Sequence, residues 1–336
     1  MAEAETHGGA GVTRGFLLGK FMPPHAGHVF LCDFARAHCD ELTILVCSLE
    51  RDTIPGASRL AWMAELFPDC RVIHHRDDVP QEPSEHADFW DIWRGLIKKA
   101  HPEPIDFVYA SEPYGHRLAA ELSARFVPVD LARQARPISA SAIREDPTAH
   151  WSSIPAPVRP HFIRRVCLFG PESTGKTTLA RQLAEHFCTA APAEYGRTYT
   201  DAFGTNLEPD DLLRIAEGQL ALEAATARQS GPVLILDTDP FLTQVWSQML
   251  FGKRDPRLDG LTSPSDLYLL TDIDVPWSDD GTRYFPGDSE RQAFFDLCQS
   301  ELERIGATYV KVSGDEATRL VFALSAIEQR LRKDRK

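Results

Sequence analysis

The segment GFLLGKFMPPHAGH, residues 15–28, decides the fold of the first half of this chain. It begins with an apolar run typical of a buried strand and continues into a loop that carries His25 and His28 just before a helix. Two prolines fix the loop backbone, and Gly27 allows a ligand or another backbone to approach closely. The two histidines have three alternative roles: metal ligands, an acid/base pair, or hydrogen-bond donors to an anion.

The pattern of this segment is repeated up to about Asp130. Stretches with helical apolar spacing separate strand-like runs, which we expect at residues 15–21, 41–48, 70–75, 105–111 and 125–130. Such β-α alternation predicts an α/β fold with a parallel sheet covered on both faces. Ligands of these sheets bind beyond the carboxyl ends of the strands, which is where the His25 loop lies.

The bulk composition is that of an ordinary globular protein of two domains. The chain has 336 residues, 43% of them hydrophobic and 25% charged. A net charge of −13 argues against a broad surface for nucleic acid or anionic membranes. Seven scattered cysteines without a CxxC pair predict reduced thiols. No signal peptide or membrane-spanning run is evident, so we expect a cytoplasmic protein; a homo-oligomer is left open.

Residues 147–163 are expected to link the two domains. The stretch DPTAHWSSIPAPVRPHF around them contains four prolines and little periodicity. The domains then span residues 13–146 and 164–334. In the second one, strands are predicted within 164–170, 232–239, 266–271 and 307–313, with a closing helix over 316–333. We expect two doubly wound parallel-sheet domains without a sequence repeat between them.

The second domain opens with a phosphate-binding loop. GPESTGKTT, residues 170–178, matches G-x-x-x-x-G-K-[ST] between an apolar strand and a helix. Backbone N–H groups of such a loop bind phosphate oxygens at a helix N-terminus. Lys176 is expected to contact the β- and γ-phosphates of ATP and Thr177 to ligate Mg²⁺. The expected ATP-binding residues are Gly170, Glu172, Ser173, Thr174, Gly175, Lys176, Thr177 and Thr178.

Carboxylates and arginines of this domain complete a predicted kinase site. Asp237, after the apolar run VLIL, is the expected Mg²⁺ contact, with Asp239 close by; the alternative is a strand-end cap. Glu194 follows a short small-residue run that is a candidate second strand, and its alternative role is a surface ion pair. Residues 275–298 resemble a lid whose Arg283 and Arg291 reach the transferring phosphoryl group.

The histidines of the first domain fit an anion site better than a metal site. His74 and His75 are adjacent on a strand and point to opposite faces, so they do not complete a ligand set. The His25 loop instead lies between a strand end and a helix start, where an α/β sheet binds anions.

Two motifs together make the family recognisable. GKFMPPHAGH resembles the HxGH signature of nucleotidylyltransferases, and ISASAIRED, residues 138–146, resembles their second signature, with Ser141 where many relatives have Thr. Followed by GPESTGKTTL, EYGRTY, LDTD and VPWSDDGTR, they make the chain similar to NadR-type proteins over about residues 13–330. These proteins fuse a nicotinamide mononucleotide (NMN) adenylyltransferase to a ribosylnicotinamide kinase. Members from enteric bacteria also carry a DNA-binding helix-turn-helix, for which the residues before Gly15 leave no room.

The resemblance implies adenylyl transfer from ATP to NMN in the first domain, giving NAD and pyrophosphate. His25 and His28 would donate hydrogen bonds to ATP phosphates, and Lys20, Ser139 and Arg144 would bind these phosphates. The implied ATP site is completed by Gly19, Phe21 and Ser141. Trp90 and Trp93 are candidates for stacking on nicotinamide, or are core residues at i, i+3 spacing. Arg59 and Arg117 are weaker ligand-binding candidates.

The second domain would phosphorylate nicotinamide riboside with ATP and Mg²⁺. The carboxylate that orients the 5′-hydroxyl is expected among Asp237, Asp239 and Glu194, in that order, and Tyr195 is a further candidate for contact with the nucleoside. Two alternatives remain open at this point. The same two enzyme classes act on another nucleoside and phosphate acceptor, or the chain is a nucleotide sensor with weak catalysis.

Overall fold

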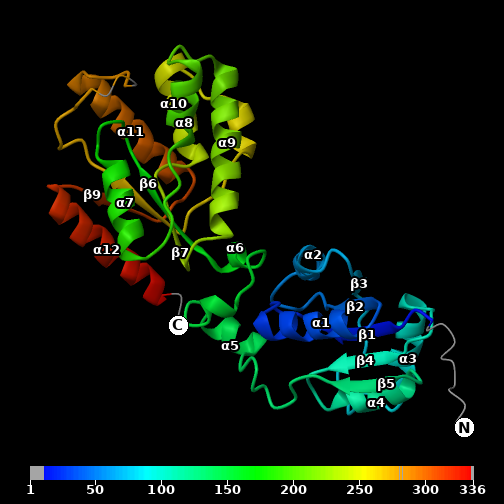
Figure 1. Cartoon of the computed structure of the whole chain (residues 1–336). Helices are drawn as coiled ribbons and strands as arrows, with labels where there is room; N and C mark the ends of the chain where they lie inside the picture. Colours follow the sequence, from blue (N-terminus) through cyan, green and yellow to red (C-terminus); the bar gives the residue numbers. More distant parts are fainter. Residues whose placement is uncertain (1–10, 280, 282, 334–336) are drawn as a thin grey trace, which may run out of the picture. The chain divides into compact units, whose positions relative to one another are not determined.

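The computed structural model describes residues 11–279, 281 and 283–333. The chain divides into two compact units, Met1–Val158 and Arg159–Lys336, each built around its own parallel sheet (Figure 1). The division falls inside the predicted linker. The prediction of two doubly wound α/β domains is confirmed. Within the described residues, no helix combines the length and apolar character that crossing a bilayer requires.

The first unit has a five-stranded sheet with strand order β3-β2-β1-β4-β5. Its strands are β1 (Arg14–Gly19), β2 (Glu41–Cys47), β3 (Arg71–His75), β4 (Phe107–Ala110) and β5 (Arg125–Pro128). Its helices are α1 (Ala26–His38), α2 (Gly56–Leu66), α3 (Phe89–Ala100), α4 (Tyr114–Glu121) and α5 (Ala140–Glu145), followed by the 3₁₀ turn η1 (Trp151–Ser153). All five strands lie where the sequence places them.

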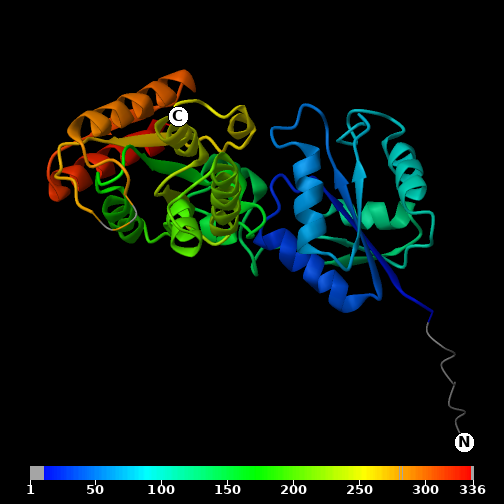
Figure 2. The same ribbon diagram turned by 90° about the horizontal axis from the view of Figure 1, so that it is seen from above.

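Helices cover both faces of this sheet, as Figure 2 shows. Strand residues alternate in direction, so neighbours along one strand serve different faces. On one face Leu17 packs with Leu31 of α1 and Met63 of α2. On the other face Phe16 packs with Trp93 of α3 and with Leu118 of α4. Both faces are therefore buried.

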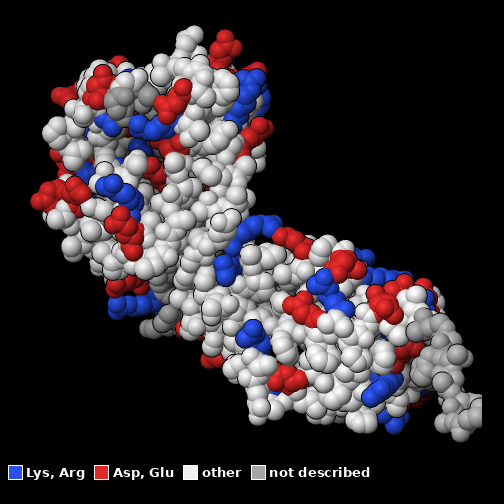
Figure 3. Space-filling model, viewed as in Figure 1, with Lys and Arg blue, Asp and Glu red and all other residues white. Residues whose placement is uncertain are grey.

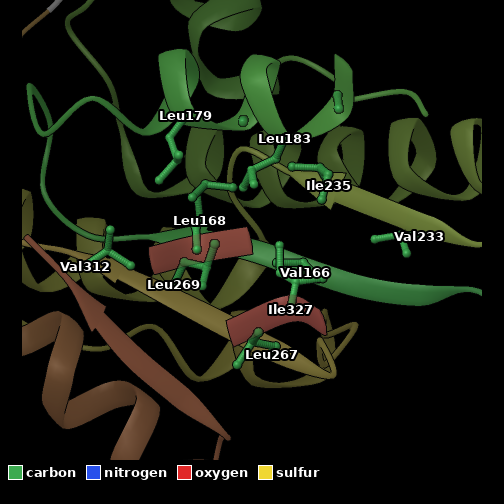
Figure 4. Close-up of a cluster of buried hydrophobic side chains, with 13 residues drawn as sticks. Val166, Leu168, Leu179, Leu183, Val233, Ile235, Leu267, Leu269, Val312 and Ile327 are labelled. Atoms are coloured by element: carbon green, nitrogen blue, oxygen red, sulfur yellow. The ribbon is translucent and has the colours of Figure 1, made fainter. Parts of the chain in front are cut away.

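The second unit has a four-stranded parallel sheet with strand order β7-β6-β8-β9. Its strands are β6 (Arg164–Phe169), β7 (Val233–Leu236), β8 (Leu267–Thr271) and β9 (Tyr309–Val312). Its helices are α6 (Arg159–Phe162), α7 (Lys176–His186), α8 (Tyr195–Phe203), α9 (Pro209–Ala227), α10 (Pro240–Phe251), η2 (Pro256–Gly260), α11 (Asp288–Arg304) and α12 (Glu316–Lys333). Helices α7 and α12 cover one face, where Leu168 and Leu269 meet Leu179, Leu183 and Ile327 (Figure 4).

One sequence prediction about secondary structure in this unit was wrong. The run before Glu194 is not a strand; Thr189 contacts β7 only through its side-chain hydroxyl, which donates to the Val233 carbonyl at 2.6 Å. Pro192, which has no N–H, does not donate to a sheet ladder. Residues 288–298 of the predicted lid lie in helix α11, which starts at Asp288, and the Glu290 carboxylate accepts the Gly287 N–H at 3.3 Å before its first turn.

Gly170, at the end of β6, is expected to tolerate no side chain. Its φ of +141° disfavours L-residues, and a Cβ there would lie 2.6 Å from the Thr271 Oγ1 and 2.9 Å from the Thr271 carbonyl oxygen. Gly170→Ala should destabilise the second unit by about 1–3 kcal/mol. The loss of unfolding free energy is measured by urea titration, with hydrogen exchange of the β6 and β8 amides as the readout for the second unit. Gly260→Ala, whose new Cβ meets nothing within 4 Å, is the matched control; equal stability of both variants would contradict the prediction.

Candidate active sites

The first unit contains a cleft of about 830 Å³ at the carboxyl ends of β1 and β4. Strand β2 lies on one side of β1 and β4 lies on its other side. The loops that follow β1 and β4 therefore diverge and leave a crevice between them. The weaker candidates Arg59 and Arg117 do not line the cleft, whereas the main candidates predicted for this domain all do: Gly19, Lys20, Phe21, His25, His28, Trp90, Trp93, Ser139, Ser141 and Arg144. The cleft is within the size range of ligand sites.

His25 and His28 are stacked at the start of α1. Their ring centroids lie 3.8 Å apart with an interplanar angle of 26°. His25 caps the helix, because its Nδ1 accepts the Gly27 N–H at 3.1 Å. An accepting Nδ1 places the ring proton of neutral His25 on Nε2. His25 therefore has one free donor for an anion.

Both histidines are neutral at physiological pH. Burial lowers the pKa of His25 to about 4, and the positive charge of Arg133 adds to this effect. Burial also lowers the pKa of His28 well below its usual value, with smaller contributions from His25 and Arg133. The pair can thus bind phosphate oxygens by hydrogen bonds, whereas positive charge must come from other side chains.

The two sequence motifs meet at this cleft. The Arg144 guanidinium donates to the Met22 carbonyl within the GKFMPPHAGH loop and to the Ser141 hydroxyl at 3.1 Å. Ser139 caps α5 by accepting the Ala142 N–H at 3.2 Å. Lys20 and Arg144 both face the cleft. On the face drawn in Figure 3, basic residues are interspersed with acidic ones, so positive charge for an anion is supplied locally.

Arg59 stabilises the loop between β1 and α1 from inside the protein and does not line the cleft. Its side chain is fully buried, and it donates to the Lys20 carbonyl at 2.7 Å and to the Asp52 carboxylate at 2.6 Å. Arg59 was a weaker ligand-binding candidate from sequence, and the structure buries it away from the cleft. Arg117 is exposed and pairs with Glu121.

Trp90 and Trp93 serve the core and the cleft together. Trp93 is buried in the cluster under α3, and its Nε1 donates to the Pro80 carbonyl at 2.9 Å. Trp90 packs edge-to-face on Phe89, with ring centroids 5.0 Å apart. The two alternatives considered from sequence are therefore compatible.

Sequence reasoning missed a basic loop between β5 and α5. Arg133 and Arg136 line the cleft, and Arg133 pairs with Glu112 at 3.0 Å. Asp130 shapes this loop by accepting backbone N–H groups of residues 134–136. The signal was present as two arginines shortly after a predicted strand.

The phosphate-binding loop of the second unit leaves β6 beside β8. Gly175, with φ +79°, caps α7, so that helix begins at Lys176. The Lys176 Nζ donates to the Pro171 carbonyl at 2.7 Å, and Thr174 shares a hydrogen bond with Thr271 at 2.7 Å. All predicted residues of this loop line a cleft except Gly170, which forms the turn: Glu172, Ser173, Thr174, Gly175, Lys176, Thr177 and Thr178.

Asp237 and Thr177 fit a magnesium ion. The Thr177 hydroxyl donates to Oδ2 of Asp237 at 2.7 Å, while Oδ1 of Asp237 is buried without a hydrogen-bond partner among the described residues. Oxygen ligands suit Mg²⁺, which usually keeps water and nucleotide phosphates as further ligands. Consistent with that, no cluster of three or more His, Cys, Asp or Glu within the described chain is grouped to hold a metal.

Asp239 is a helix cap, and the prediction of direct substrate contact was wrong. It is fully buried; its Oδ1 accepts the Phe241 N–H at 3.0 Å and its Oδ2 accepts the Tyr268 hydroxyl at 2.7 Å. Burial raises the pKa of Asp239 to about 7, despite these bonds. Its oxygens are occupied, and it does not line the cleft.

Glu194 and Tyr195 differ in position although they are neighbours. Glu194 lines the cleft, and burial raises its pKa against the opposing charge of Lys176. Tyr195 packs against Gly218 of α9, where an added Cβ would lie 2.0 Å from its ring. Tyr195 does not line the cleft, which corrects its expected contact with the nucleoside.

The two arginines predicted for the lid have different environments. Arg283 lines the cleft and donates to the Ser173 Oγ at 2.7 Å. Arg291 lies in α11, is buried and donates to the Val275 carbonyl at 2.8 Å. Its expected reach to the phosphoryl group is therefore wrong, because helix α11 points it into the protein.

The acceptor side of this cleft was missed from sequence. Residues far apart in the chain line it together: Arg197, Thr200, Leu207, Leu212, Ile215, Gln219, Thr243, Trp246 and Tyr284. Trp246 lies in an apolar helix, where its pattern is that of a core residue. Only packing of α8, α9 and α10 shows that these side chains face the phosphate-binding loop.

Comparisons with known proteins agree with this two-site architecture. Residues 165–319 match the model of a family described as an AAA domain. The trifunctional NAD biosynthesis/regulator protein NadR of Escherichia coli is 31% identical over 330 residues, covering 90% of this chain and 80% of that protein. The chain belongs to the NadR family. The resemblance inferred from the motifs is confirmed.

Solved NadR structures match nearly the whole of this NadR-family chain. A NadR protein in complex with NAD and AMP-PNP has a TM-score of 0.74 and 25% identity, with coverage of 95% of this chain and 96% of that one. A NadR protein in complex with NR has a TM-score of 0.76 at the same identity and coverage. Both units therefore have the NadR fold.

Protonation of His25 is expected to destabilise the first unit. The pKa of about 4 lies below the unperturbed 6.5, so the unfolded chain binds more protons between these values. Stability should fall as pH drops from 6.5 to 4, by up to about 3 kcal/mol. Hydrogen exchange of α1 across this range measures the slope. His25→Asn, which keeps an acceptor for the Gly27 N–H, should flatten it; an equally steep slope would show that His25 is not responsible.

Proposed function

We propose that this NadR-family chain makes NAD in two ATP-dependent steps. The second unit phosphorylates nicotinamide riboside to NMN, and the first unit joins NMN to the adenylyl group of ATP. The observation that supports this most directly is the presence of two separate nucleotide sites. One cleft unites the HAGH and ISASAIR motifs, and the other joins a phosphate-binding loop to a carboxylate-bearing acceptor cleft.

In the kinase step the 5′-hydroxyl of the riboside attacks the γ-phosphorus of ATP and ADP leaves. Catalysis of phosphoryl transfer is mainly positioning and charge stabilisation. Lys176 and the loop amides would bind the β- and γ-phosphates, and Arg283 would contact them from the other side of the cleft. Mg²⁺, held by Thr177 and Asp237, would neutralise phosphate charge.

Glu194 is our choice for the carboxylate that orients the hydroxyl and takes its proton. Asp239 is fully occupied by hydrogen bonds, and Asp237 accepts the Thr177 hydroxyl and would hold the metal. Glu194 lines the cleft with a raised pKa, which suits a group that must gain a proton near neutral pH. This order reverses the one expected from sequence.

In the adenylyl-transfer step an NMN phosphate oxygen attacks the α-phosphorus of ATP and pyrophosphate leaves. The nucleophile is already an anion, so the step needs no general base. His25 and His28 would donate to phosphate oxygens on which negative charge develops, as neutral groups. Lys20, Arg133 and Arg144 would supply the positive charge that the histidines lack.

The two activities should separate by mutation. Lys176→Ala should abolish phosphorylation of nicotinamide riboside and leave adenylylation of supplied NMN intact. His28→Ala should do the opposite, lowering kcat of adenylyl transfer about 100-fold or more, since it removes a donor to the developing charge. Product identification with riboside, ATP and Mg²⁺ is the measurement. If the wild-type chain forms neither NMN nor NAD, the proposed function is wrong.

Glu194→Gln should lower kcat of the kinase about 100-fold to 10,000-fold, because the amide cannot take a proton. It should also remove the acid limb of the kcat pH profile, which in the wild-type chain reflects protonation of Glu194. The NMN adenylyltransferase rate of the same variant reports on its integrity. Full kinase activity in Glu194→Gln would assign the proton to another group.

A further inference from the structure

Glu172 is an unexpected residue within the phosphate-binding loop. In the sequence it stands between Pro171 and Ser173, within a loop whose backbone amides bind anions. The negative charge of its side chain opposes that of an incoming polyphosphate. It is also buried, with 8% of its surface exposed. A buried carboxylate is costly unless other groups satisfy it. Its partners therefore indicate its purpose.

The partners of Glu172 are backbone amides of a distant segment. The Tyr284 N–H donates to both carboxylate oxygens, at 2.9 and 3.1 Å, and the Phe285 N–H donates to Oε1 at 2.6 Å. Hydrogen bonds to an ionised acceptor are about twice as strong as neutral ones. Glu172 thus fixes the main chain at these two residues, more than 100 positions away in sequence.

The neighbouring loop residue makes a second attachment to the same segment. The Ser173 Oγ accepts the Ser278 N–H at 2.9 Å and a hydrogen bond from the Arg283 guanidinium at 2.7 Å. Two consecutive residues of the phosphate-binding loop therefore hold the chain that precedes α11. Its described residues between 272 and 287 form no strand or helix of their own.

The attached residues form one wall of the acceptor cleft. Tyr284 and Arg283 both line it, as Glu194 does. The Tyr284 hydroxyl donates to the Thr205 carbonyl at 2.6 Å, and this bond connects the wall to the loop that follows α8. The position of Tyr284 in the cleft therefore depends on where Glu172 holds its backbone.

We propose that Glu172 is a positioning residue that couples the phosphate-donor loop to the nucleoside cleft. Its carboxylate seats the Tyr284 backbone, so the aromatic wall for the nucleoside is complete only when the phosphate-binding loop has the conformation seen here. This inference rests on the proposed kinase activity and specifies how the acceptor site is formed. It gives Glu172 a structural contact across the cleft in addition to its place in the ATP loop.

The competing explanation is that aromatic packing alone seats this wall. Trp246 stacks near Phe285 with ring centroids 6.0 Å apart, and Phe294 packs edge-to-face on Trp246 at 4.8 Å. In that case removal of the carboxylate would leave the acceptor site unchanged. The two explanations predict different kinetic constants.

The test compares Glu172→Ala and Glu172→Gln with the wild-type chain. We expect Glu172→Ala to raise KM for nicotinamide riboside about 10-fold to 100-fold, the loss expected when charge-assisted bonds of a buried group are removed. KM for ATP and kcat should change less than KM for the riboside does. Glu172→Gln, which keeps one acceptor oxygen, should have an intermediate KM. Hydrogen exchange at the amides of Tyr284 and Phe285 should accelerate in the same order.

Glu290→Gln is the matched control, since Glu290 also accepts a nearby backbone N–H, from Gly287 at 3.3 Å, but does not line the cleft. Its KM for the riboside should equal that of the wild type. An unchanged riboside KM in both Glu172 variants would overturn the proposal, as would a fall in kcat alone. If Glu172→Ala fails to fold, Glu172→Gln decides. Absence of riboside phosphorylation by the wild type would instead refute the kinase function itself.

Discussion

The reversal of strand order at one central strand of each parallel sheet is the constraint on which both sites depend. The first strand of each unit lies between the next strand of the chain and a later one: β1 between β2 and β4, and β6 between β7 and β8. The helices that follow the two adjacent strands cover opposite faces, so their loops diverge and leave a crevice. The HAGH loop and the phosphate-binding loop both start at such a crevice. Their chemistry differs, but the geometric origin of the two clefts is the same.

Electrostatics at both clefts is local. The chain carries a net charge of −13, yet each cleft must bind polyphosphates. In the first unit, burial keeps His25 and His28 neutral, and Lys20 and Arg144 provide charge beside them. In the second unit, Lys176 stands at the start of α7, and one oxygen of Asp237 is buried without a hydrogen-bond partner among the described residues. Anionic ligands are thus met by a few placed groups and helix N-termini.

Much of the fold could be predicted because its signals are local. Apolar runs gave all the strands of both sheets, and the closing helix 316–333 has the predicted bounds. The predicted strand before Glu194 failed because the run forms no ladder with the sheet, although Ala191 packs against its hydrophobic core, and Pro192 has no N–H to donate. The prediction for Arg291 failed because the lid pattern did not reveal that a helix starts at Asp288. Periodicity alone cannot tell a polar loop from a solvated helix.

What the sequence determined by itself is the chemistry that lies on contiguous motifs: the HAGH loop, ISASAIR and the phosphate-binding loop with its helix. Each is fixed within a few residues, because backbone conformation and helix capping are short-range. Only the tertiary structure decided which carboxylate faces the acceptor, that Asp239 is a cap, and that Glu172 holds the backbone of Tyr284. These outcomes depend on contacts between segments separated by tens of residues or more, and burial then assigns each polar group the partners that are within reach.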